Sequence, residues 1–159
     1  MGGGPGRGLR SSQPVDGGVS IVLNNTLDAV EDGRQALLGL FHNLGLASPT
    51  IHRLEVIFEE VVSNIVRHGF TPGSDQSIRV RVTAKTDVID LIFEDDGTPF
   101  NPLLVAAPAP YTDLQTARIG GRGIPLVTVL SSSMRYETPE RDGAFKPTNR
   151  LVLTMSTAA

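Results

Sequence analysis

The chain has 159 residues, a hydrophobic fraction of 40% and a mean hydropathy near zero, as expected for one globular domain with some tail. The net charge of -3, the 5% aromatic content and the lack of tryptophan argue against a nucleic-acid partner. The chain has no cysteine, which excludes disulfides and thiolate chemistry. It also has no apolar run of about 20 residues and no apolar N-terminal signal, so we expect a cytoplasmic protein without a membrane segment.

The first third of the chain predicts a tail, a strand and a helix. Residues 1–18 are rich in glycine and include Pro5 and Pro14, so we expect a disordered tail. Residues 19–23 form a short apolar run typical of a strand, and residues 24–26 offer polar helix caps. Apolar residues then recur at helical spacing over residues 27–44, and the glycine that follows suits the end of that helix.

A longer helix follows, and the rest of the chain is organised around it. Ser48 suits the N-cap and Pro49 the first helical position, and the pattern ends at Gly69. Steps of three and four place one group of apolar residues on a single face: Leu54, Ile57, Phe58, Val61, Val62 and Ile65. This face is predicted to pack on the core.

A row of polar residues runs beside that apolar face. Glu60, Asn64 and His68 are spaced four apart, so they lie above one another along the helix. Glu59 points further toward solvent and is interpreted as an ordinary surface acid. The row could form the wall of a cleft or could simply be a solvated helix edge, and the helix alone leaves both open.

The middle of the chain predicts a β-hairpin. Residues 77–84 alternate apolar and polar side chains, and residues 88–94 form a second strand. Residues 85–87 make the tight turn between the strands, and residues 71–75 are a loop before them. The second strand ends in a turn at residues 95–100.

The last third predicts a long connection, a helix and two strands. Residues 101–120 lack a clear period, and connections of this length are usually functional or mobile. Glycines at residues 120–123 then lead into an apolar helix over residues 124–130. Strands are expected at residues 134–137 and 151–155.

This order of elements predicts an α+β fold. We expect a two-layer α/β sandwich, with helices on one face of a mixed, mostly antiparallel sheet. Residues 19–159 would form this domain after the tail.

Two short motifs add to the polar row of the helix. Asp95-Asp96-Gly97 follows a strand, and Gly121-Arg122-Gly123 opens a helix. Alone, the first motif is commonly just a turn, and the second often reflects only tight packing. No Gly-Lys-Ser/Thr sequence is present, which excludes a P-loop, and the glycines do not directly follow a strand as in a dinucleotide-binding unit.

Together, the three segments resemble the boxes of the GHKL ATPase superfamily, whose fold is called the Bergerat fold. Residues 60–69 match its N box, residues 95–100 its G1 box and residues 121–124 its G2 box. The form of the helix, the Gly-x-Pro-Phe turn and the compact chain are most similar to bacterial anti-sigma-factor serine kinases. The resemblance covers residues 20–157.

The resemblance implies a site for ATP and Mg2+. Asn64 would bind the metal through its amide oxygen, a suitable hard ligand. Asp95 would accept a hydrogen bond from the adenine amino group, and Gly97 would let the backbone approach the base. In the G2 box, the backbone amides of Gly121 and Gly123 would face the phosphates. Arg122 would either stabilise charge on the terminal phosphate or be a solvated residue of the lid. Ile124 completes the match to this box. Residues 101–120 would be the lid.

The resemblance also implies that Glu60 is the general base that deprotonates a serine hydroxyl. His68 is predicted to be a structural hydrogen-bonding residue at the helix end. The leading hypothesis is therefore a serine kinase that phosphorylates an anti-sigma-factor antagonist and, in another state, holds a sigma factor. Such relatives commonly form homodimers through the sheet, and residues 19–23 could supply an edge.

Two other hypotheses stay open at this stage. The chain could be a non-catalytic ATP-binding module that sequesters a partner, although the intact Glu60 favours a kinase. It could also be the catalytic piece of a histidine kinase, but it has no room for the dimerisation helices that such kinases use. The gyrase and chaperone members of the superfamily need further domains.

Overall fold

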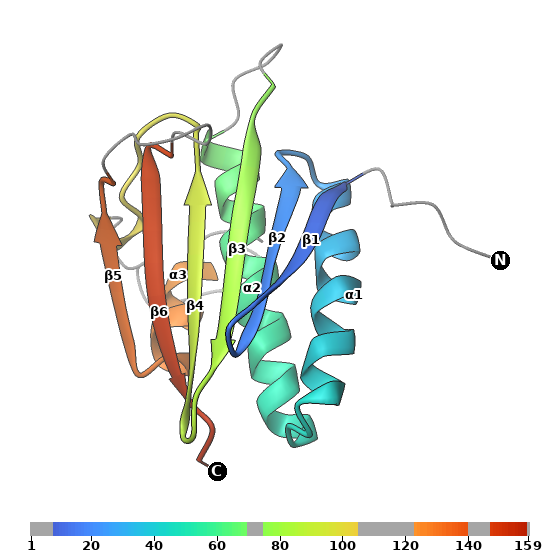
Figure 1. Ribbon diagram of the computed structural model, residues 1–159. Helices are drawn as coiled ribbons and strands as arrows, with labels where there is room; N and C mark the ends of the chain where they lie inside the picture. Colours follow the sequence, from blue (N-terminus) through green and yellow to red (C-terminus); the bar gives the residue numbers. More distant parts are fainter. Residues whose placement is uncertain (1–7, 70–74, 105–122, 140–146, 159) are drawn as a thin grey trace, which may run out of the picture.

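The protein consists of one antiparallel sheet with helices on one side, as seen in a computed structural model that describes residues 8–69, 75–104, 123–139 and 147–158 (Figure 1). The six strands follow the order β1-β2-β3-β4-β6-β5, and each described pair of neighbours is antiparallel. The strands are β1 Leu9–Val15, β2 Gly18–Asn24, β3 Ser77–Ala84, β4 Val88–Asp95, β5 Ser133–Glu137 and β6 Asn149–Ser156.

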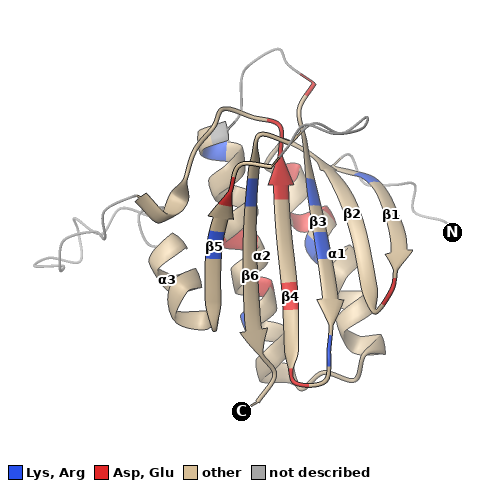
Figure 2. Ribbon diagram, turned by 60° about the vertical axis from the view of Figure 1, so that its left-hand side comes forward, with Lys and Arg blue, Asp and Glu red and all other residues tan. Residues whose placement is uncertain are grey.

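The helices all cover the same face of the sheet (Figures 1 and 2). They are α1 Asp28–Asn43, α2 Ser48–Gly69 and α3 Gly123–Leu130, with a short 3-10 helix η1 at Pro102–Leu104. Helix α2 lies between α1 and α3 and contacts both. The α+β sandwich expected from the sequence is therefore confirmed, although no parallel pair occurs among the described strands.

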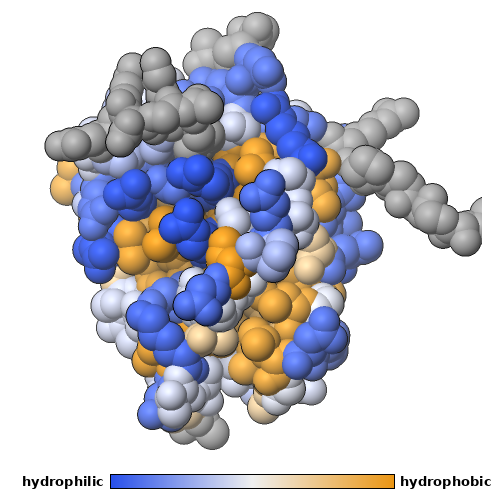
Figure 3. Space-filling view, in the orientation of Figure 1, coloured by the Kyte–Doolittle hydropathy of each residue, from blue (hydrophilic) through white to orange (hydrophobic). Residues whose placement is uncertain are grey.

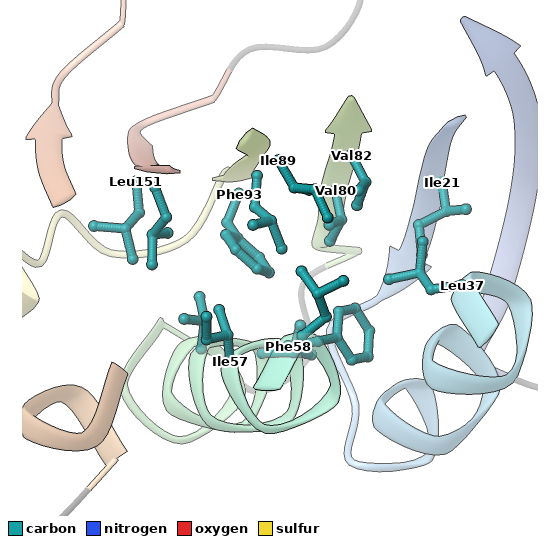
Figure 4. Close-up of a cluster of buried hydrophobic side chains, with 14 of the residues drawn as sticks. Ile21, Leu37, Ile57, Phe58, Val80, Val82, Ile89, Phe93 and Leu151 are labelled. Atoms are coloured by element: carbon teal, nitrogen blue, oxygen red, sulfur yellow. The ribbon is translucent and has the colours of Figure 1, made fainter. Parts of the chain in front are cut away.

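The core fills the space between α2 and the middle of the sheet (Figure 4). Phe58 of α2 meets Phe93 of β4 with ring centroids 6.5 Å apart. The apolar face predicted for α2 is buried, apart from Ile65, which is half-buried. In β3 and β4, alternate side chains such as Val80 and Leu91 are fully buried, because successive residues of a strand face opposite sides of the sheet.

The opposite face of the sheet carries charged and apolar side chains together (Figure 3). Glu94 forms ion pairs with Arg79 and Arg150, both at 2.9 Å, and its side chain is only 4% exposed. Arg150 also reaches Glu137 at 3.3 Å, so the ion pairs link four strands. The strand alternation places a few apolar side chains on the same face: Val22, Ile92 and Val152.

The prediction of a disordered tail over residues 1–18 is wrong from residue 8 on, because residues 9–15 form β1, residues 16–17 the turn and Gly18 the start of β2; residues 1–7 lie outside the described residues. Strand β1 pairs with β2 through a two-residue turn in which Gly17 has φ +75, a conformation that favours glycine. As a result, residues 19–23 lie within β2 between β1 and β3, so they are not the edge expected for a dimer.

Of the signals predicted for the two ends of α1, only the one at the C-terminal end is confirmed. Gly45 has φ +67 and follows the helix, as the stop signal predicted. At the start, Leu27 is the N-cap residue and makes no side-chain cap, so the capping role expected for residues 24–26 is wrong. The loop predicted at residues 71–75 falls almost entirely outside the described residues.

Two glycines of α1 should respond oppositely to alanine. A Cβ on Gly33 would lie 2.5 Å from Cζ of the buried Phe58 ring and 3.1 Å from Leu23, so Gly33→Ala should overpack the core and cost about 1–3 kcal/mol. A Cβ on Gly39 meets nothing within 4 Å, so Gly39→Ala should stabilise the helix by about 0.5–1 kcal/mol. Urea unfolding would measure both changes, and a Gly33→Ala protein as stable as wild type would contradict this packing.

Candidate functional site

A pocket opens where α2 passes the ends of β4 and β6. It encloses about 390 Å³ of space, a volume that includes open solvent at its mouth. The lining residues are Val61, Asn64, Ile65, His68, Phe93, Asp95, Thr98, Phe100, Pro102, Tyr136, Asn149 and Leu151. Among the described residues no lysine or arginine lines the pocket, and most of its lining is apolar with a few polar groups, as is usual for small-molecule sites.

Asp95 is the acidic group of this pocket and stands at the last position of β4. The residue is 4% exposed. Its Oδ1 accepts two hydrogen bonds, from the backbone N–H of Gly97 and from Nδ2 of Asn149, both at 3.0 Å. Within the described residues Oδ2 accepts none, so one carboxylate oxygen remains available to a ligand.

Burial dominates the ionisation of Asp95. Removal from water raises the pKa of this carboxyl above its ordinary value, while the hydrogen bonds from Asn149 and Gly97 lower the pKa and the neighbouring Asp96 raises it. The net effect is a raised pKa, which means that the folded protein bears a cost for keeping this group charged.

Asn149, which lines the pocket, and Thr148 beside it hold the end of β4, and the sequence analysis missed both. Asn149 is the first residue of β6 and pairs directly with Asp95 across the sheet, and Thr148 directly precedes this strand. The Thr148 backbone N–H donates to the Asp95 carbonyl at 2.8 Å, and its hydroxyl donates to the Gly97 carbonyl. No short motif marks these residues, because their role depends on a strand pairing that spans a long stretch of chain.

The polar row of α2 reaches the pocket in part. Asn64 lines it and makes no hydrogen bond within the described residues, so the structure brings Asn64 and Asp95 together in one cavity. Glu60 stands one turn earlier, half-buried, without an ion pair or hydrogen bond in the described part, and it does not line the pocket. Glu59 is exposed, as predicted.

His68, at the end of the row, stacks on Phe100. The ring centroids are 5.0 Å apart and the ring planes differ by 16°. Both rings line the pocket. The hydrogen bond predicted for His68 is not formed within the described residues, and a ring contact joins the helix to the turn after β4 instead.

The G2 segment can be placed only in part. Gly121 and Arg122, like residues 105–120 of the expected lid, lie outside the described residues. Gly123 is the first residue of α3, as predicted, and Ile124 follows it half-buried. Ile124 does not line the pocket.

The described residues contain no group of three or more acidic or histidine side chains that could hold a metal ion. A magnesium ion here would need oxygens from its ligand and from water in addition to the Asn64 amide, which is the usual arrangement for this ion with phosphates. None of the described helices is long and apolar enough to cross a membrane.

Comparison with known proteins gives matches consistent with this geometry. The family described as "Histidine kinase-like ATPase domain" matches residues 23–155. The serine/threonine-protein kinase BtrW of Bordetella bronchiseptica is 30% identical over 105 residues, which cover 66% of this chain and 70% of that protein. The serine-protein kinase RsbW of Listeria monocytogenes is 28% identical over 107 residues, covering 65% of this chain and 68% of that protein.

Proposed function

Because this chain belongs to the histidine kinase-like ATPase domain family, we propose that its pocket binds ATP with Mg2+ and that the protein is a serine-protein kinase. The supporting observation is the single cavity shared by Asn64 and Asp95, residues that come from the N box and the G1 box. Each has polar atoms without a partner in the described residues, so each can accept a ligand. The names of the two kinases cited above favour the same activity.

Asp95 is proposed to select the base. Its free Oδ2 can accept a hydrogen bond from the amino group of adenine, and Gly97 lies beside it in the turn that follows β4. The apolar walls of the pocket, including Ile65 and Leu151, suit the faces of a flat ring. Gly121, Arg122, Gly123 and Ile124 are proposed to serve the phosphates, as the G2 match implies.

Asn64 is proposed to hold the metal and Glu60 to act as base. Magnesium, when bound, neutralises phosphate charge. The amide oxygen of Asn64 is a hard ligand suited to this ion. Glu60, one helical turn away on the same side of α2, would accept the proton of a serine hydroxyl from a protein substrate.

We propose that the substrate is an anti-sigma-factor antagonist and that the protein also binds a sigma factor, because the N box and the Gly-x-Pro-Phe turn resemble those of kinases of that class. A homodimer through the sheet is proposed on the ground that no described helix covers its outer face, which bears Val22, Ile92 and Val152. A sedimentation mass of one chain at micromolar concentration would contradict the proposed dimer.

The function is tested by comparing wild type with Asn64→Ala. Calorimetry should detect Mg-ATP binding by wild type. Asn64→Ala should weaken the free energy of this binding by about 1.5–3 kcal/mol, the value of a hydrogen bond or ligand contact to a charged group. With EDTA present the two proteins should bind ATP nearly equally, because the amide acts through the metal. Equal affinities in Mg2+ would contradict the assignment of Asn64.

Phosphoryl transfer is followed with γ-labelled ATP, Mg2+ and antagonist proteins encoded in the same genome. Labelled serine on an antagonist supports the kinase. A protein that binds ATP and an antagonist yet transfers no label would instead support the alternative, a non-catalytic module that sequesters its partner.

A further inference from the structure

Asn149 uses all the hydrogen-bonding capacity of its side chain inside the pocket. Its Nδ2 donates to Oδ1 of Asp95 and to the carbonyl of Thr98, each at 3.0 Å. Its Oδ1 accepts from the backbone N–H of Phe100 at 2.9 Å and from the hydroxyl of Tyr136. A primary amide has two donors and two acceptor positions, and each is filled here in a residue that is 6% exposed.

These bonds join three separate parts of the pocket wall. One reaches the end of β4 at Asp95, two reach the turn at residues 98–100 and one reaches β5 at Tyr136. All of these segments line the same pocket. The amide of Asn149 therefore fixes the position of the acidic group relative to the wall that a bound ring would touch.

The arrangement also decides which atom of Asp95 meets a ligand. Asn149 and the N–H of Gly97 both occupy Oδ1, which leaves Oδ2 without a partner in the described residues. Both bonds are donated to the carboxylate, so they favour its charged form against the effect of burial. The other titratable groups nearby are Asp96, next in sequence, and His68 and Tyr136 in the pocket lining.

We propose that Asn149 is the positioning residue that sets the base selectivity of this pocket: it holds one oxygen of Asp95 and the turn at residues 98–100, so that the other oxygen alone meets the amino group of an adenine. The inference rests on the proposed nucleotide function and assigns a role to a residue outside the three boxes. It predicts that changes at Asn149 alter the preference for adenine more than they alter nucleotide binding in general.

The test compares ADP with IDP, whose base carries a carbonyl where adenine carries its amino group. Wild type should prefer ADP by about tenfold or more, the effect of a hydrogen bond to a charged group. Asn149→Asp keeps the shape and both acceptor bonds but removes both N–H donors, and it places two carboxyl groups about 3 Å apart, which therefore share a proton. The ADP-to-IDP preference should fall toward one, mainly through weaker ADP binding.

Two control variants show whether a changed ADP-to-IDP preference comes from lost positioning of Asp95, from lower protein stability or from an added charge. Gly33→Ala should weaken the core at a residue that does not itself line the pocket, and Asn43→Asp makes the same chemical change at the exposed end of α1. Both should keep the wild-type preference. Asn149→Ser, a neutral variant too short to reach Asp95 and Thr98 together, should lose it, and this variant serves if the aspartate variant does not fold.

A readout without nucleotide completes the test. The carboxyl carbon of Asp95, followed by NMR in the free protein, should titrate at higher pH in Asn149→Asp than in wild type. An unchanged Asp95 titration together with an unchanged ADP-to-IDP preference would overturn the inference while leaving the proposed function intact. A wild-type protein that binds neither nucleotide would overturn the proposed function, and the selectivity role with it.

Discussion

Replacing Glu60 with glutamine is expected to slow phosphoryl transfer by roughly 10²- to 10⁴-fold, the usual contribution of a general base, while Mg-ATP affinity stays within about twofold. Glutamine keeps the size of the side chain but cannot take a proton at neutral pH. Glu60 makes no ion pair or hydrogen bond within the described residues and does not line the pocket, so the fold and the binding of nucleotide should tolerate the change. Single-turnover transfer of γ-labelled phosphate to the antagonist, with ATP in excess, isolates this step.

Glu59 provides the matched control. It is the adjacent residue of α2, it is exposed, and its ion pair with Arg34 is long, at 3.9 Å. Glu59→Gln removes the same charge from the same helix and should transfer phosphate at close to the wild-type rate. Equal rates for Glu60→Gln and wild type would show that Glu60 is not the base, and equal losses in both variants would point to an electrostatic effect of the helix.

Replacing Asp95 with asparagine is expected to weaken Mg-ADP binding by roughly 10- to 150-fold, which corresponds to about 1.5–3 kcal/mol for a hydrogen bond to a charged group. The variant oxygen can still accept from Gly97 and Asn149, but an N–H₂ group replaces Oδ2 and faces the adenine amino group as a second donor. The loss of binding therefore comes from replacing Oδ2 alone, because the substitution keeps the shape of the pocket.

The same substitution should leave the free energy of unfolding unchanged or raise it at neutral pH. Because the folded-state pKa of Asp95 is raised, the charged carboxylate costs stability above that pKa, and the cost disappears below the pKa of the unfolded chain. Asparagine removes this cost. The stability gap between the variant and wild type should accordingly shrink as the pH falls, and wild-type affinity for ADP should fall over the same pH range as the carboxylate gains a proton.

Urea unfolding and calorimetry across this pH range measure the two effects on the same samples. Loss of binding together with retained stability is the expected combination. A variant that binds Mg-ADP as tightly as wild type would show that Asp95 does not bind the nucleotide. A variant that loses binding only because it unfolds would contradict the burial cost inferred for the carboxylate.

Most of the fold could be predicted because its signals are local. The apolar face of α2 and the alternation in β3 and β4 are patterns within single elements, and the structure confirms them. Strand β1 was missed because an edge strand buries little: its sequence is mostly polar, and Pro14 is tolerated where one side of the strand is unpaired. The dipeptide Asp16-Gly17 was the available signal for its hairpin.

The site could be predicted only where each residue lay in a recognisable segment. Asn64 and Asp95 were expected to meet, and they share one pocket. Asn149 was missed because it reaches Asp95 through the β4–β6 register, and the 138–148 loop carries no signal that fixes this register. The last strand was also predicted to begin two residues too late to include Asn149. The roles of Glu60, Asn64 and Asp95 stay predictions, as do those of Gly121 and Arg122.

The central claim is that one adenine nucleotide, bound with magnesium, occupies the pocket between α2 and the ends of β4 and β6. Chemical-shift mapping of the labelled protein with Mg-ADP tests it most directly. We predict saturable shifts concentrated at Asn64, Gly97, Phe100 and Asn149, with little change on the outer strand β1. Saturable shifts confined to residues away from this pocket, or none at millimolar Mg-ADP, would contradict the account.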